Sequence, residues 1–469
     1  MLEGFASLVG VISNVMYSYL LIIMLLAVGL YFTLRSRFVQ LRLLPESIRV
    51  VGEKTDSNSV SAFQALMVST ASRVGTGNIV GVANAIAIGG YGAVFWMWLI
   101  AIVGGASAFV ESTLAQIYKR KGKDGECYGG PAYYIEAALH CRPLAIIFCI
   151  SMIATYAFGF NMLASYNLQS TFSGFSFYDV KWTPWIIGGI LAVITGWCLL
   201  GGGSRIVKVT STLVPAMGVA YILISVIVMI INRAYLPVVF SKIISEAFDF
   251  KAIFGAFAGS AMMQGIRRGL YSNEAGIGSA PNASASAQVS HPIKQGLVQM
   301  LSVFIDTLLL CTATAMMCLS SGIAPAQELQ GAPWVQAALH ESLGNFGPLF
   351  ITVAMVLFAF TTLLGNCFYC DNLLNYIHKG QPSKTFMKGF RIVSALVVFI
   401  GAGMEVSMLW NISDVLMGVM ALINIPVILI LSNTALKALE DYEKQKKNGE
   451  NPVFKTGNIG LEYETDYWS

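Results

Sequence analysis

The sequence contains 469 residues, of which 56% are apolar and only 12% are charged. Soluble domains carry roughly 25% charged residues, so this composition excludes an ordinary soluble protein and indicates a chain embedded in lipid. The formal net charge of +4 comes from 29 basic and 25 acidic residues spread along the chain, which excludes a nucleic-acid-binding footprint.

A helix needs about 20 mostly apolar residues to cross the hydrocarbon core of a bilayer. The candidate spans on this measure are residues 15–34, 60–88, 93–118, 143–172, 184–201, 207–232, 252–287, 295–321, 347–376, 390–404 and 408–432. Lys and Arg concentrate in cytoplasmic loops. With the N-terminus outside, 22 of the 29 basic residues fall on the cytoplasmic side, 4 fall outside, and Arg73, Arg267 and Arg268 lie at membrane depth. We therefore expect an all-α multi-pass protein of the plasma or inner membrane, with about eleven helices and a solvated cytoplasmic tail.

Two of the expected spans are interrupted by glycine and polar residues. Residues 72–78 read Ser-Arg-Val-Gly-Thr-Gly-Asn, and residues 269–281 read Gly-Leu-Tyr-Ser-Asn-Glu-Ala-Gly-Ile-Gly-Ser-Ala-Pro. A lone glycine cluster fits close helix packing as well, but these two also carry Asn, Thr, Ser and charge. Non-helical backbone is tolerated at this depth only where protein buries it or water reaches it, and matched interruptions in two halves indicate a transport site.

The interrupted spans lie five spans apart, which predicts a five-plus-five inverted repeat with two discontinuous helices. The expected parts are an N-terminal helix with a basic connector over 1–59, the first repeat over 60–232, the second repeat over 252–432, and the cytoplasmic tail over 433–469.

Unwound backbone at membrane depth offers free N–H and C=O groups together. Such a site suits the two ends of a zwitterionic amino acid and also a sodium ion, which needs several oxygen ligands. Thr361 and Thr362 lie midway along the ninth span and could add hydroxyl oxygens. The alternative is that both hydroxyls bond back to carbonyls of their own helix.

At these residues the chain closely resembles the sodium:alanine symporter family, also called the alanine or glycine:cation symporters, over about residues 15–435. The stretches that carry the resemblance are Gly-Thr-Gly-Asn-Ile at 75–79, Gly-Ala-Val-Phe-Trp-Met-Trp at 92–98, Glu-Ser-Thr-Leu-Ala-Gln at 111–116, Gly-Gly-Pro at 129–131, Tyr-Ser-Asn-Glu-Ala-Gly at 271–276, Gly-Ser-Ala-Pro at 278–281 and Phe-Ile-Asp-Thr at 304–307. The resemblance implies the inverted-repeat fold shared with neurotransmitter:sodium symporters, and sodium-coupled transport of a small neutral amino acid by alternating access.

By position, the resemblance also implies roles for individual residues. Those implied to meet the polar end of the substrate, or to form the opposing wall, are Gly75, Thr76, Gly77, Asn78, Tyr271, Ser272 and Asn273. Those implied to hold sodium are the carbonyls of Ala71 and Val74 with the side chains of Thr361 and Thr362.

The sequence departs from the family at two positions expected to face the pocket. Ala164 stands where family members commonly have glutamine, and Asn366 stands where they often have tryptophan. Alanine or glycine is the substrate that the resemblance favours, but a larger neutral amino acid such as glutamine remains an alternative.

Ionisable residues within the expected spans each need a partner or a role, because insertion costs about 2.5–3.5 kcal/mol per charge. We expect Arg73 to pair with Glu274 or Asp371 as part of a gate below the site, or else to form a static pair that fixes helix packing. Asp306 either approaches the cation or supports the broken helices, and Glu111 anchors packing.

Other functions fit the sequence less well. The four histidines lie at loop or interface depth, and neither a His-Glu-x-x-His motif nor a phosphate-binding loop is present, which argues against an enzyme. A channel would show repeated selectivity loops. Proton coupling is the main alternative to sodium and would need Asp306 or Glu274 at the ion site. The expected partners are a small neutral amino acid, sodium and the bilayer, without an organic cofactor or nucleic acid.

Overall fold

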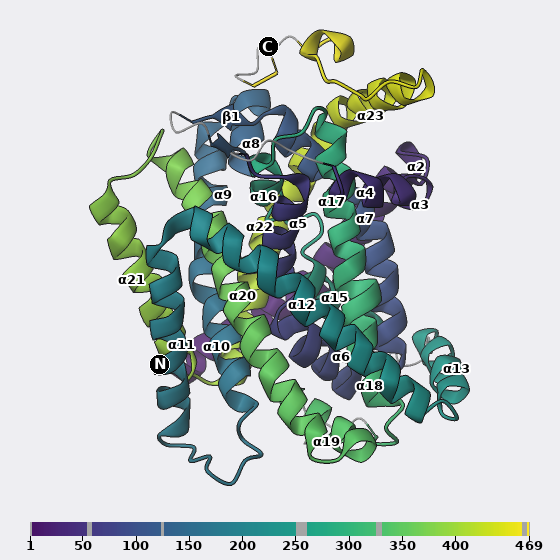
Figure 1. Cartoon of the computed structure of the whole chain (residues 1–469), viewed down its shortest axis with the longest axis vertical. Coiled ribbons are helices and arrows are strands. Elements are labelled where there is room, and N and C mark those ends of the chain that lie inside the picture. The colour runs from purple at the N-terminus through teal and green to yellow at the C-terminus, as the bar shows by residue number, and fades with distance from the viewer. Residues whose placement is uncertain are drawn as a thin grey trace.

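The computed structural model describes residues 2–53, 59–122, 126–249, 260–324, 331–461 and 467–468. The described chain is almost entirely helical, and its strands are the short antiparallel pair β1 (Arg120–Lys121) and β2 (Cys127–Tyr128). Figure 1 shows a tall bundle of helices, with α23 (Ser432–Lys447) across one end and α13 (Leu236–Ala247) and α19 (Gly331–Leu343) at the other. The expectation of an all-α multi-pass protein is confirmed.

Within the described residues, eight helices are long and apolar enough to cross a membrane. They are built from α1 (Leu2–Val15), η1 (Met16–Leu20) and α2 (Leu21–Arg35); α7 (Gly92–Ile117); α9 (Arg142–Ile153), η3 (Ala154–Gly159) and α10 (Phe160–Ser170); α11 (Thr183–Leu200); α12 (Gly202–Ile231); α17 (Pro292–Val303), η5 (Phe304–Cys311) and α18 (Thr312–Leu319); α20 (Phe346–Ile377); and α22 (Val406–Ile430). Here η1, η3 and η5 are π-helical segments. The other three expected spans are the two interrupted ones and α21 (Lys384–Gly401), which begins with basic residues.

The first interruption is confirmed and is shorter than predicted. A capping box starts α5 (Ala62–Arg73): the Gln64 N–H donates to Ser61 Oγ at 3.1 Å, and the Ser61 N–H donates to Gln64 Oε1 at 3.0 Å. After α5 the chain leaves the helix over 74–76, then continues as η2 (Gly77–Gly81) and α6 (Val82–Gly89). The Gly75 N–H, which would close the next helical turn, donates instead to Asn78 Oδ1 at 2.8 Å.

The second interruption lies between α15 (Ala261–Asn273) and α16 (Pro281–Ser286). The break lies within the run 269–281 but begins after its first residues, because α15 remains helical to Asn273 and ends where Glu274 takes a φ of 55°. Gly269 serves close packing: a Cβ there would lie 2.7 Å from Ile100 Cγ2 of α7. Gly276 and Gly278 do unwind the chain, with φ of 84° and 88°. The predicted start of this span, over 252–259, lies outside the described residues.

The C-terminal tail does not form the solvated extension that its polarity predicted. Phe454 is 3% exposed and Trp468 is 9% exposed. The Phe454 N–H donates to the Ser290 carbonyl at 2.9 Å, and Trp468 Nε1 donates to the Gln116 carbonyl at 2.7 Å. Two aromatic side chains therefore anchor the tail against the ends of α7 and α17, because their apolar surface is removed from water there.

The basic segments assigned to one side of the membrane gather at one end of the bundle. Lys294 lies 2.8 Å from Glu53, Lys446 lies 3.1 Å from Glu46, and Arg42 pairs with Glu443 across the same region. These residues belong to or adjoin α3 (Val39–Arg42), α4 (Leu44–Val51), α17 and α23, which lie at the upper end in Figure 1. The remaining short elements are α8 (Pro131–Leu139) and η6 (Thr456–Ile459).

Candidate functional site

The first break is pressed between two neighbouring helices that leave no room for side chains. A Cβ on Gly75 would lie 2.1 Å from Thr362 Oγ1 of α20, and a Cβ on Gly77 would lie 2.8 Å from Tyr271 Cε1 of α15. Real Cβ atoms do not approach other atoms this closely, so a larger residue at either position would force Thr362 or Tyr271 to shift. The unwound main chain is therefore in direct contact with α20 on one side and the end of α15 on the other.

One buried carboxylate joins the two broken helices. Asp306, on η5, accepts a hydrogen bond from Asn78 Nδ2 at 2.7 Å and another from Ser272 Oγ at 2.8 Å. Asn78 Oδ1 already accepts the Gly75 N–H, so the Asn78 side chain holds the shape of the first break. Of the two roles predicted for Asp306, the support of the broken helices is the one these contacts show.

The two threonines of α20 differ in their surroundings. The Thr361 hydroxyl donates to its own helix, to the carbonyls of Leu357 at 2.9 Å and Phe358 at 3.2 Å. The Thr362 hydroxyl is buried without a hydrogen-bond partner in the described part of the chain, and it faces Gly75. Uncharged oxygens are suitable ligands for a hard cation. Ala71 and Val74, the other residues implied for sodium, lie at the end of α5, and both are fully buried.

The residues predicted for the second wall lie at the end of α15. Tyr271 covers Gly77 and Ser272 binds Asp306, so both reach the first break. Asn273 turns into its own break, where its Oδ1 accepts the Ala275 N–H at 3.0 Å.

The two positions that depart from the family pattern are also buried. Asn366 accepts from Ser72 Oγ at 2.7 Å and donates to Asn161 Oδ1 at 2.9 Å. Ala164 is fully buried on α10.

The ion pair expected between Arg73 and Glu274 or Asp371 is not formed. Arg73 Nη1 donates to the Gln299 carbonyl at 3.3 Å, and among the described residues no carboxylate lies within ion-pair distance of it. Helical side chains lean toward the N-terminus of their helix, which directs this guanidinium back along α5 to α17. Asp371 pairs instead with Arg391 at 2.7 Å, and Glu274 accepts from Ser279 Oγ at 2.6 Å.

Glu111 has a larger role than the helix packing predicted for it. Its carboxylate accepts the N–H groups of Gly276 at 3.1 Å and Gly278 at 3.0 Å, and Asn424 Nδ2 at 2.9 Å. The two glycine N–H groups are main-chain donors released by the second break, and a buried donor without a partner costs about 1–3 kcal/mol. Glu111 therefore stabilises the unwound segment. In the sequence, this role was indicated by a carboxylate at membrane depth that is followed by hydroxyl residues.

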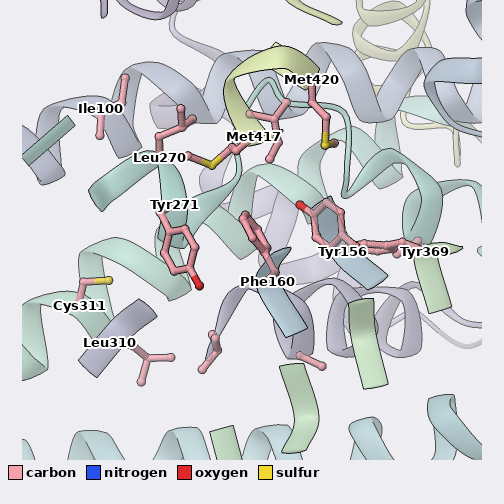
Figure 2. Packing of buried hydrophobic residues seen from close by; sticks show 14 of the residues in the cluster. Ile100, Tyr156, Phe160, Leu270, Tyr271, Leu310, Cys311, Tyr369, Met417 and Met420 are labelled. Atoms are coloured by element: carbon pink, nitrogen blue, oxygen red, sulfur yellow. The ribbon is translucent and has the colours of Figure 1, made fainter. Parts of the chain in front are cut away.

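A row of aromatic side chains crosses the middle of the molecule beside the breaks. Ring centroids are 4.9 Å apart from Trp410 to Tyr271, 4.9 Å from Tyr271 to Phe160, 5.0 Å from Phe160 to Tyr156 and 5.4 Å from Tyr156 to Tyr369. Figure 2 shows the last four of these rings side by side. Tyr271 was predicted for the wall of the site, but the row was not, because its other members lie on separate segments that carry no local signal of their own.

The two ends of the molecule differ in their access to this region. A cavity of about 580 Å³ reaches the Trp410 end of the row and is also lined by the start of α19 and the end of α6, away from α23 (Figure 1). On the α23 side, Asn372 of α20 donates to Asn282 Oδ1 of α16 at 2.6 Å and to the Gly129 carbonyl at 2.5 Å. The site is therefore approached by a cavity from one end and closed by hydrogen bonds toward the other.

The family model described as the sodium:alanine symporter family matches residues 2–456. The chain belongs to this family. The amino-acid carrier protein AlsT of Bacillus subtilis (strain 168) is 45% identical over 97% of this chain and 96% of that protein. The probable sodium/glutamine symporter GlnT of the same strain is 43% identical over 95% of this chain and 92% of that protein. The crystal structure of MhsT in complex with L-phenylalanine shares the fold, with a TM-score of 0.54 at 14% identity over 88% of this chain and 93% of that one.

Membership of the sodium:alanine symporter family confirms the resemblance found in the sequence. This family member is a sodium-coupled amino-acid symporter of a membrane and is not an enzyme. Sodium and an alanine-type amino acid are the transported partners that the family implies.

Proposed function

We propose that this symporter carries a small neutral amino acid, alanine or glycine, together with sodium, by alternating access around the two breaks. The carrying observation is that the unwound main chain at Gly75 and Gly77 lies directly against Thr362 and Tyr271. Main-chain N–H groups of the first break, with the side chains of Thr76 and Asn78, would take the substrate carboxylate. The cation would lie at the end of α5, between the carbonyls of Ala71 and Val74 and the Thr362 hydroxyl. The Thr361 hydroxyl donates its proton to its own helix, so it can coordinate the cation only through the lone pairs of its oxygen.

The same proposal includes the membrane arrangement. Eleven spans result when the two interrupted helices and α21 are added to the eight long ones. In chain order they form one N-terminal helix within 1–59 and two five-helix repeats over 60–232 and 252–432. The tail over 433–469 follows them. The end that carries α23 and the ion pairs Lys294–Glu53 and Lys446–Glu46 would be cytoplasmic, which leaves the N-terminus outside. The cavity beside Trp410 would then open outward.

Glutamine is the second candidate substrate. It is favoured by Ala164 and Asn366, which are smaller than the glutamine and tryptophan common in the family, and by the printed name of a relative that is 43% identical. A smaller pair of side chains leaves more volume for a longer substrate. Proton coupling is the other alternative, through the buried carboxylate of Asp306 or Glu274.

Uptake into proteoliposomes tests these proposals together. Purified protein is reconstituted with an imposed inward sodium gradient at fixed pH, and labelled alanine, glycine and glutamine are added in turn with unlabelled competitors. We expect concentrative alanine or glycine uptake that disappears when monensin collapses the sodium gradient. Uptake driven by a proton gradient in sodium-free buffer would contradict the ion assignment, and uptake of glutamine alone would contradict the substrate assignment.

A further inference from the structure

The inner end of the second broken helix is held by two side chains from the end of α7. Gln116 Nε2 and Lys119 Nζ both donate to the Ala287 carbonyl, at 3.0 and 2.9 Å. Ala287 directly follows α16, the half of this helix that lies toward the α23 end of the molecule (Figure 1). A helix leaves its last carbonyls without partners of its own, and a cation beside them is favourable. Gln116 and Lys119 therefore fix the inner end of α16 to α7.

The end of the C-terminal tail covers these two side chains. Lys119 Nζ lies 3.7 Å from the Tyr467 ring centroid and 5.1 Å from the Trp468 ring centroid. Trp468 Nε1 donates to the Gln116 carbonyl at 2.7 Å. Lys119 is only 1% exposed, so the two rings stand where water would otherwise solvate its ammonium group. Cation–π contacts strengthen when they are removed from water, and the tail therefore supports the attachment of α16 to α7.

The same tail crosses the loop that connects α16 to α17. The Ser290 carbonyl accepts the Phe454 N–H at 2.9 Å, and Ser290 Oγ donates to the Pro452 carbonyl at 2.8 Å. The His291 ring lies 5.2 Å from the Phe454 ring, which in turn lies 5.3 Å from the Trp468 ring. The contacts with the loop and those with the end of α7 are thus connected through one group of aromatic side chains.

This loop is also attached to the first broken helix. The Gln288 N–H donates to the Val60 carbonyl at 3.0 Å, and Ser59 Oγ donates to Gln288 Oε1 at 2.8 Å, just before α5 begins. The loop therefore links the inner ends of α5 and α16, which are the inner halves of the two broken helices. The inner side is closed in this arrangement, where Asn372 donates to Asn282 Oδ1 at 2.6 Å.

We propose that the C-terminal tail is a strap, formed by residues 451–461 and 467–468, that holds the inner side closed and must detach before that side opens. The proposal rests on the proposed function, because alternating access moves parts of the protein apart around the breaks on the inner side. A segment that binds only the closed arrangement shifts the equilibrium toward it by the free energy of that binding. The alternative is an anchor that stays docked in both arrangements. The strap is favoured because its contacts bridge α7 and the α16–α17 loop instead of lying on one element.

A reversible cross-link between the strap and the loop tests whether the strap must detach. Val453 is 52% exposed and lies between Pro452 and Phe454, which both contact Ser290. Purified full-length Ser290→Cys/Val453→Cys is joined with a short bifunctional thiol reagent that dithiothreitol removes, and is then reconstituted. We expect the cross-link to lower sodium-driven alanine uptake at least about tenfold, reduction to restore uptake, and sodium-dependent alanine binding to persist throughout. The two single-cysteine variants, which keep the same eight native cysteines, are the matched controls.

Trp468→Ala weakens the strap without a cross-link. We expect its half-saturation for external alanine in right-side-out vesicles to rise about fivefold, because fewer molecules then face outward. Its maximal uptake rate should not fall, because inward opening becomes easier. Trp182→Ala is the matched control: it removes a tryptophan that is 59% exposed just before α11, and it should leave the half-saturation unchanged.

The possible outcomes separate this proposal from the proposed function. Undiminished uptake by the cross-linked protein, or an unchanged half-saturation in Trp468→Ala, would overturn the strap and leave the symporter proposal intact. Neither uptake nor binding of alanine, glycine or glutamine by the untreated wild type would overturn both. If one of the two variants fails to fold, the other decides alone.

Discussion

Gly75 is the glycine of the first break that has the least space for a side chain, because Thr362 lies against it. Gly75→Ala tests how much this close packing contributes to stability and uptake. The added methyl group would lie 2.1 Å from Thr362 Oγ1, whereas unstrained non-bonded heavy atoms lie about 3.5–4.0 Å apart. Over-packing of this kind costs about 1–3 kcal/mol, because side chains or main chain must shift to relieve it. We expect Gly75→Ala to lower the melting temperature and to weaken uptake.

Thr362→Ala separates the steric effect from the proposed sodium ligand. In the double variant Gly75→Ala/Thr362→Ala the obstructing hydroxyl is gone, so about 1–3 kcal/mol of stability should return as a coupling energy between the two positions. Sodium binding should not return, because Oγ1 is the proposed ligand. If this ligand contributes as much as a hydrogen bond to a charged group, about 1.5–3 kcal/mol, the sodium half-saturation rises about 10- to 100-fold.

Thr361→Ala is the matched control for this series. Its hydroxyl lies one residue away on the same helix, but it lies against the Leu357 and Phe358 carbonyls and is not the hydroxyl that contacts Gly75, so its loss should change the sodium half-saturation much less. Uptake is measured in proteoliposomes over a range of sodium concentrations, and melting is measured in detergent. A wild-type sodium half-saturation in Thr362→Ala would refute the ligand assignment. An unchanged melting temperature in Gly75→Ala would refute the steric reasoning.

Three further substitutions test the electrostatic and tail contacts. Glu111→Ala leaves the buried N–H groups of Gly276 and Gly278 unpaired, while Asn424 Nδ2 keeps its hydrogen bond to the Gly276 carbonyl, so the substitution should cost at least about 2 kcal/mol of stability; an unchanged melting temperature would contradict this. Because Arg73 makes one hydrogen bond, to the Gln299 carbonyl, and no ion pair with any described carboxylate, Arg73→Lys should keep most uptake and Arg73→Gln should lose it; equal losses would favour a bidentate gate. Burial holds the pKa of His291 below its ordinary value, more strongly than Asp441 raises it. The unfolded chain therefore binds more protons as the pH falls below about 6.5, and wild-type melting should drop more steeply there than that of His291→Asn; parallel pH curves would contradict it.

The sequence predicted those features of the site that are encoded within one short segment, and it predicted less well those that depend on contacts between segments. The first break was predicted closely, because Gly75, Gly77 and Asn78 combine missing side chains with polarity inside one apolar span. The second break could only be placed within residues 269–281, since Gly269 has the same local appearance as Gly276 and Gly278 but is needed for close contact with α7. Sequence spacing does not distinguish a glycine that unwinds a helix from one that lets a neighbour approach.

Contacts between distant segments could not be predicted in this way. The Arg73 side chain was expected to find a carboxylate, but its partner depends on which helix lies below α5, and that is α17. The aromatic row depends on rings from several helices meeting at one level, and the buried tail depends on Phe454 and Trp468 reaching the ends of α7 and α17. Each of these requires the three-dimensional arrangement that the hydropathy pattern leaves open.

The charges around the breaks give a physical reason for coupling in the proposed function. Arg73 acts electrostatically on three buried carboxyl groups, Glu111, Glu274 and Asp306, so acidic groups outnumber basic ones there, and any second carboxyl that ionises leaves a negative charge uncompensated. A substrate carboxylate about 8 Å from one uncompensated charge is repelled by about 2 kcal/mol at an effective dielectric constant of about 20. A sodium ion beside Thr362 would offset part of this repulsion. Sodium should therefore raise the affinity for the amino acid, and the amino acid must then raise the affinity for sodium by the same factor.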